Sequence, residues 1–111
     1  MNGDGYDDIV RAANNATMYI DYQTAGGGAF TEQSYANTIG DPWGMCVGDV
    51  NNDGMNDVLW GDNGSAYMLV RNGSTYTGTN LSTTTGAGYL FTQGANMFDI
   101  DNDGNLDAFV C

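Results

Sequence analysis

The feature that most constrains this chain is a short acidic run at residues 49–57. Side-chain oxygens fall at every second position, a glycine follows, and a last carboxylate closes the run: Asp49, Asn51, Asp53, Gly54 and Asp57. Ca²⁺ takes about 6–8 oxygen ligands at roughly 2.3–2.6 Å, and a loop bearing carboxylates and one carbonyl supplies them. Gly54 allows the sharp turn, because a residue without Cβ tolerates positive φ. The sequence therefore predicts a cation-binding loop whose four oxygen-bearing side chains act together with the Met55 carbonyl.

The run occurs again at residues 99–107, and a shortened version stands at residues 2–8. Asp4 and Asp53 are 49 residues apart, and Asp53 and Asp103 are 50 apart. A period near 50 in a β-rich chain is typical of propeller blades. Each such blade is a four-stranded antiparallel sheet.

An EF-hand is the first alternative, because its loop begins in the same way. That motif requires a Glu at the twelfth position and helices on both sides. The twelfth positions here are Trp60 and Val110, which offer no side-chain oxygen, and the flanking residues 45–47 and 58–60 are strand-like. A ligand-bearing turn between two strands is a calcium-clipped hairpin, and the EF-hand is rejected.

Short apolar runs at regular spacing, without a helical period, predict an all-β chain. We expect strands at residues 8–11, 17–22, 30–32, 43–48, 57–60, 66–70, 75–77, 96–98 and 107–111. Asn72-Gly73 is a strong hairpin turn signal. The predicted organisation is a partial first blade at 1–40, a second blade at 41–90, and the first hairpin of a third blade at 91–111.

Residues 47–60, followed by residues 68–73, resemble the FG-GAP or VCBS-type repeat of integrin-α-like propellers and of several lectins. The resemblance covers nearly the whole chain and implies calcium in the hairpin that joins the first two strands of a blade. Carried over by position, it marks Asp49, Asn51, Asp53, the Met55 carbonyl and Asp57, then Asp99, Asp101, Asp103, the Asn105 carbonyl and Asp107. In the first loop it marks Asn2, Asp4, the Tyr6 carbonyl and Asp8, with Met1 standing where Val50 does.

The formal net charge of −12 is concentrated in the three loops. Ten of the 14 acidic residues lie there: Asp4, Asp7, Asp8, Asp49, Asp53, Asp57, Asp99, Asp101, Asp103 and Asp107. Bound cations would neutralise most of this charge in place. A nucleic-acid partner is excluded, because phosphate binding needs Lys and Arg and the chain has only Arg11 and Arg71. No stretch approaches the ~18 apolar residues of a membrane span.

Two features favour an extracellular or cell-surface location. Asn-x-Ser/Thr acceptor sites occur at Asn15, Asn63, Asn72 and Asn80. A calcium site of this kind also fills best where the ion is millimolar. Cys46 and Cys111 permit one disulfide without requiring it, and unpaired buried thiols are the alternative.

Ring closure is a problem, because propellers have about 4–8 blades and this chain carries two blade equivalents at most. Either the chain is part of a longer propeller or copies of it assemble, for example three copies into a six-bladed ring. The expected strands number one too many for two blades, and the surplus strand could be exchanged with a neighbour. We therefore expect a homo-oligomer or the remainder of a longer propeller.

The sequence predicts a non-enzyme, because there is no histidine and most carboxylates are committed to metal. Structural metal loops leave little room for a substrate, unlike catalytic sites with an open position. Two functions remain open: a recognition or adhesion module for glycan or protein, and a structural subunit that assembles into rings or filaments. Several aromatic residues either stack on a sugar or fill the space between blades: Trp43, Trp60, Tyr67, Tyr76, Tyr89 and Phe91.

Overall fold

The computed structural model describes residues 1–36, 40–62, 64–81 and 92–111. These residues form only strands, turns and bends. In chain order the strands are β1 (Ile9–Ala13), β2 (Thr17–Gln23), β3 (Phe30–Ala36), β4 (Gly44–Gly48), β5 (Asp57–Gly61), β6 (Ala66–Asn72), β7 (Thr75–Asn80), β8 (Ala95–Phe98) and β9 (Asp107–Val110). The all-β prediction is confirmed. A search of the described residues for helices long and apolar enough to cross a membrane finds none.

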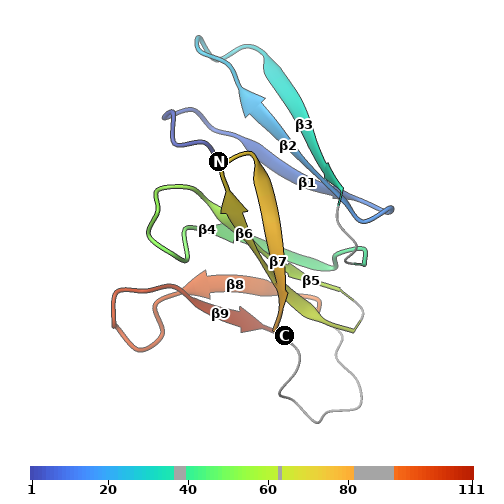
Figure 1. Ribbon diagram of the computed structural model, residues 1–111, viewed down its shortest axis with the longest axis vertical. Coiled ribbons are helices and arrows are strands. Elements are labelled where there is room, and N and C mark those ends of the chain that lie inside the picture. Colours follow the sequence, from blue (N-terminus) through green and yellow to red (C-terminus); the bar gives the residue numbers. More distant parts are fainter. Residues whose placement is uncertain (37–39, 63, 82–91) are drawn as a thin grey trace. The chain divides into compact units, whose positions relative to one another are not determined.

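The strands form three antiparallel sheets (Figure 1). The first sheet has the order β1-β2-β3, the second β4-β5-β6-β7, and β8 and β9 make a two-stranded hairpin. A four-stranded antiparallel meander, as in the second sheet, is the arrangement of a propeller blade. The chain divides into two compact units, Met1–Asp41 and Pro42–Cys111.

The second sheet is built around β5, which is paired on both sides, to β4 and to β6. Its residues Asp57, Val58, Leu59 and Trp60 have no exposed surface. Side chains of a strand alternate between the two faces of its sheet, so apolar residues at both Leu59 and Trp60 mean that both faces of β5 are covered. A run of apolar residues on consecutive positions is typical of such a strand.

The β8–β9 hairpin packs against β4 within the second unit, and two glycines permit the close approach. A Cβ on Gly44 would lie 3.0 Å from the carbonyl carbon of Gly94, and a Cβ on Gly48 would lie 2.8 Å from Cδ1 of Leu106. Met97, in β8, also contacts Gly48 and is 8% exposed. The hairpin therefore packs against the β4 and β5 side of the second sheet.

The first unit has one apolar face and one charged face. Met18 and Ile20 of β2 are fully buried. On the other face Arg11 donates from Nε to Asp21 at 2.8 Å and from a terminal nitrogen to Glu32. The Arg11 guanidinium also lies 4.4 Å from the centre of the Tyr19 ring. Alternation along β2 separates these two sets of side chains.

Two outer strands are longer than the sequence predicts. β3 runs to Ala36 and β7 to Asn80, whereas we expected residues 30–32 and 75–77. Both strands are almost wholly exposed, so hydrogen bonds to their neighbours extend them without any apolar alternation. The predicted Asn72-Gly73 turn is present, and Gly73 has a φ of 60°.

Candidate metal centre

The three acidic loops share one backbone conformation. Asn52 and Asn102 have positive φ, 58° and 61°, and Gly54 and Gly104 follow with φ of 83° and 90°. Asn is among the few residues with a side chain that visit this left-handed region routinely. The first loop has glycines at both corresponding positions, Gly3 and Gly5, with φ of 75° and 86°. Three segments about 50 residues apart therefore fold in the same way.

In the second loop the side-chain oxygens turn inward and accept hydrogen bonds from the loop's own amides. The Asp53 amide donates to Asp49 Oδ1 at 3.1 Å and to Asn51 Oδ1 at 3.0 Å. The Gly54 amide donates to Asp49 Oδ2 at 2.8 Å, and the Met55 amide donates to Asp53 Oδ1 at 2.8 Å. These bonds orient the oxygens of three predicted ligands.

The third loop repeats this network atom for atom. The Asp103 amide donates to Asp99 Oδ1 at 3.0 Å and to Asp101 Oδ1 at 3.2 Å, and the Gly104 amide donates to Asp99 Oδ2 at 2.9 Å. The Asn105 amide donates to Asp103 Oδ1 at 2.8 Å. Hydrogen bonds from Asn105 lower the pKa of Asp103 below its ordinary value, because they favour the charged carboxylate.

The aspartate that closes the loop is held by both of its oxygens. Asp57 is fully buried; its Oδ2 accepts from the Val50 amide at 3.0 Å and its Oδ1 from the Arg71 amide at 2.8 Å. In the third loop Asp107 Oδ2 accepts from the Ile100 amide at 2.9 Å. The closing aspartate thus ties the start of its loop to the strand that leaves it.

The first loop keeps the same arrangement with the chain's amino group in place of an amide. The Met1 amino group lies 2.6 Å from Asp8 Oδ2, and the Gln23 amide donates to Asp8 Oδ1 at 3.0 Å. Burial by itself would raise the pKa of Asp8, but hydrogen bonds from Met1, Gln23 and Asn2 outweigh it, and this pKa is lowered. Asp4 accepts from the Tyr6 amide, and Asn2 accepts from the Asp4 amide.

The chemistry of the donors in the third loop fits a hard divalent cation. Asp99, Asp101 and Asp107 each place one carboxylate oxygen within 4.8 Å of the others. Clustered carboxylates are the ligands that Ca²⁺ prefers. Asp103, a fourth predicted ligand, lies outside this group. In the second loop Asn51 stands where Asp101 does, so its cluster has one carboxylate fewer. The carbonyl ligands predicted at Tyr6, Met55 and Asn105 stay predictions.

Two features of the loops had not been expected from the sequence. The left-handed conformation of Asn52 and Asn102 could have been inferred, because glycine occupies the matching place in the first loop. The contact between neighbouring loops could not: Asn52 Nδ2 donates to Asn105 Oδ1 at 3.3 Å. The sequence gives no sign of this contact, because side-chain amides on exposed loops follow no periodic pattern from which a contact could be predicted.

The aromatic candidates are scattered. Trp60 is fully buried, and Trp43 is 58% exposed. Tyr67 and Tyr76 are half-buried, and the Tyr76 hydroxyl donates to the Asn56 carbonyl at 3.4 Å. Tyr89 and Phe91 lie outside the described residues. The burial of Trp60 removes it from any sugar-stacking surface.

Cys46 and Cys111 are free thiols, and neither is fully buried. The Cys46 thiol lies 3.7 Å from Asn96 Oδ1. The disulfide that the sequence permits is therefore absent between these two described residues; the thiols are unpaired, as the alternative expected, but they are not buried.

Comparison with known proteins identifies the repeat. A family model described as FG-GAP-like repeat matches residues 1–60 and again residues 49–110. No curated protein and no solved structure matches the chain. The two matches together span almost the whole sequence, and each match includes two of the three acidic loops. The chain belongs to the FG-GAP-like repeat family.

Proposed function

We propose that this chain is a calcium-stabilised recognition module that works outside the cell. FG-GAP repeats are found in extracellular adhesion and propeller proteins, are generally structural or adhesive rather than catalytic, and often bind Ca²⁺. The cation is structural: it holds the two strands that flank each loop. The ligand is a glycan.

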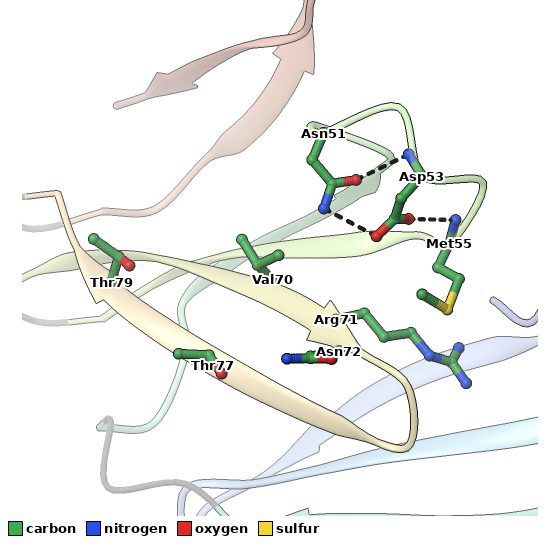
Figure 2. Close-up of a pocket in the computed structure, with 8 residues that line it drawn as sticks. All are labelled: Asn51, Asp53, Met55, Val70, Arg71, Asn72, Thr77 and Thr79. Atoms are coloured by element: carbon green, nitrogen blue, oxygen red, sulfur yellow. Dashed lines mark hydrogen bonds between the residues drawn. The ribbon is translucent and has the colours of Figure 1, made fainter.

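One observation carries the choice of recognition over a purely structural role. A groove of about 450 Å³ lies between the second acidic loop and the β6–β7 hairpin (Figure 2). This volume falls within the ~300–1,000 Å³ that is usual for ligand sites. Its lining comes from the loop and from both strands: Asn51, Asp53, Met55, Val70, Arg71, Asn72, Thr77 and Thr79.

The lining suits a hydroxyl-rich ligand. Val70 and Thr77 are directly opposite each other on neighbouring strands, and Thr79 and Asn72 lie on the same face of the sheet. Hydroxyl and amide groups both donate and accept hydrogen bonds, as sugar hydroxyls do. Val70 and Met55 add apolar surface for the C–H faces of a pyranose.

The cation and the groove are coupled through shared residues. Asn51 and Asp53 line the groove and are also predicted calcium ligands. Figure 2 shows them joined to each other, with Asn51 Nδ2 donating to Asp53 Oδ2 at 3.0 Å. A filled loop would restrict both side chains to one arrangement, so less conformational freedom is lost when the ligand binds. Binding is therefore expected to depend on calcium.

A glycan array probed in calcium buffer and again in EDTA tests this function. We expect retention on a subset of glycans, abolished by the chelator. Replacing Thr77 and Thr79 by Val keeps the shape of the strand and removes two hydroxyls, so affinity should fall at least about tenfold. The matched control is Thr31→Val, an exposed β3 threonine that does not line the groove. Unchanged affinity of the Thr77→Val/Thr79→Val protein would contradict the assignment of the groove.

A structural subunit that polymerises is the second candidate. It is favoured by the exposed aromatic side chains of the β8–β9 hairpin, because Phe98 is 46% exposed and Phe109 is 50% exposed. Ordered polymers in calcium buffer, together with no retention on any glycan, would support that candidate instead.

A further inference from the structure

Hydrogen bonds to the closing aspartates align the first sheet with the second. The Gln23 amide donates to Asp8 Oδ1, and the Arg71 amide donates to Asp57 Oδ1. Gln23, in β2, therefore corresponds to Arg71, in β6. The two sheets can be compared position by position from this point.

The alignment places a large ring in the first sheet where the groove of the second sheet has a small side chain. Val70 lines the groove, and Figure 2 shows it pointing from β6 toward the side of the acidic loop. Its counterpart in β2 is Tyr22. Val70 is paired with Thr77, and Tyr22 is paired with Thr31. The threonine on the neighbouring strand is thus common to both sheets, whereas its partner differs by a phenol ring.

Tyr22 covers part of the apolar face of the first sheet. Its hydroxyl oxygen lies 3.1 Å from that of Tyr35. Tyr35 is paired with Met18, four residues away from Tyr22 along β2. A strand rises about 3.3 Å per residue, so the two positions are about 13 Å apart along the sheet. The hydroxyls can meet only if both rings lie along the face between them, and Ile20, between them on that face, is fully buried.

The second sheet has neither of these rings. Val70 stands in the place of Tyr22, and Leu81, four residues after the partner of Val70, stands in the place of Tyr35. Met68, which corresponds to the fully buried residue between the two tyrosines, is only half-buried. The described residues that line the groove include no aromatic ring. The second sheet therefore leaves open a ring-sized space that the first sheet fills with its own side chain.

We propose that Val70 determines which ligand the groove accepts, and that the ring of a pyranose takes the place that Tyr22 fills in the first sheet. This inference rests on the proposed glycan function. A pyranose, like a phenol, is a six-membered ring that carries hydroxyl. Its C–H face packs on Val70, and its hydroxyls exchange hydrogen bonds with Thr77 and Thr79. Specificity then follows from size, because a larger side chain at position 70 excludes the sugar ring.

Val70→Tyr tests the inference by giving the second sheet the residue of the first. Affinity is measured in calcium buffer for the glycans that the unmodified protein retains. We expect it to fall at least about tenfold, because the phenol ring occupies the space of the sugar ring. Melting in calcium and in EDTA should change little, since tyrosine suits a strand. Ile9→Tyr is the matched control: it adds the same ring at a 49% exposed position on β1 and should leave affinity unchanged.

A size series at position 70 separates exclusion of the ring from a loss of folding. Val70→Thr has nearly the shape of valine, and Val70→Leu reaches further across the groove. Affinity should fall in the order Thr, Leu, Tyr, so the comparison of Thr with Leu remains decisive if the tyrosine variant does not fold. Equal affinities for these two variants would contradict the assignment of Val70.

The failure of this inference can be told apart from the failure of the proposed function. If the unmodified protein binds glycans and Val70→Tyr binds them equally well, Val70 does not determine the ligand, and the glycan function stands. If the unmodified protein retains no glycan in calcium buffer, the proposed function is wrong and the inference falls with it.

Discussion

Asp57 closes the second acidic loop, begins β5 and is one of the predicted calcium ligands. It has no exposed surface, and two backbone amides donate to it, from Val50 and Arg71. Both bonds come from backbone amides, so we expect the aspartate to contribute to stability as an acceptor as well as a predicted ligand. Its neighbours on β5, Val58, Leu59 and Trp60, are fully buried.

Replacing Asp57 by Ala should destabilise the protein even in EDTA. Two part-buried amides would lose a charged acceptor, and we expect a loss of about 2–4 kcal/mol in the free energy of unfolding. Urea denaturation monitored by tryptophan fluorescence measures it. Asp53→Ala, in the exposed part of the same loop, is the control and should cost much less under chelation. An Asp57→Ala protein that is as stable as the unmodified protein in EDTA would mean that Asp57 acts through the metal alone.

At this scale the sequence revealed the oxygen donors but not what orients them. The alternation of Asp49, Asn51 and Asp53 indicated inward-pointing side chains, and the structure has their oxygens accepting from loop amides. The amides of Val50 and Arg71 could not be predicted, because every residue except proline carries one. Which amide meets Asp57 depends on the pairing of β5 with β6, which is a property of the sheet.

The strands divide into those with an apolar pattern and those without. β5 and β2 carry consecutive or alternating apolar residues and were predicted nearly to their ends. β3 and β7 are polar on both faces, so only part of each could be recognised. Their remaining length follows from pairing to β2 and β6, which a single-strand pattern does not encode.

Gly44→Ala should loosen the packing of the β8–β9 hairpin on β4. The added Cβ would stand 3.0 Å from the Gly94 carbonyl carbon and 3.1 Å from the Ala95 nitrogen, and backbone atoms cannot move aside as a side chain can. We expect a destabilisation of about 1–3 kcal/mol, measured by thermal melting.

Gly28→Ala is the matched control for Gly44→Ala, because nothing lies within 4 Å of its Cβ position. That variant should be neutral or slightly stabilised, since alanine restricts the unfolded chain. A neutral Gly44→Ala protein would show that the hairpin does not approach β4 closely.

The whole molecule carries 14 acidic and 2 basic side chains, and most of the acidic ones are gathered in loops. Like charges held close together oppose folding unless a counter-ion is bound. The composition therefore predicts a dependence of folding on cations. It did not predict which loop brings three carboxylates together, because that depends on the Asp101/Asn51 difference and on local hydrogen bonds.

Calcium should raise the stability of the folded protein. With the dissociation constants of about 10⁻⁴–10⁻³ M that are usual for extracellular modules, 10 mM Ca²⁺ adds about 1–3 kcal/mol per occupied site. Melting temperature in EDTA and in increasing Ca²⁺ measures the effect. Equal concentrations of Mg²⁺ control for charge screening. Identical melting in EDTA and in Ca²⁺ would rule out cation binding by the loops.

The amide contact from Asn52 to Asn105 joins the second and third loops at 3.3 Å. An ion bound by one loop would restrict the Asn side chain through which that loop contacts the other loop. Less conformational freedom then remains to be lost when the second ion binds. Calcium uptake by the pair should then be cooperative, and calorimetry would record an isotherm steeper than that of two independent sites. Asn105→Ala keeps the backbone carbonyl and removes the contact, and it should make the two sites fill independently.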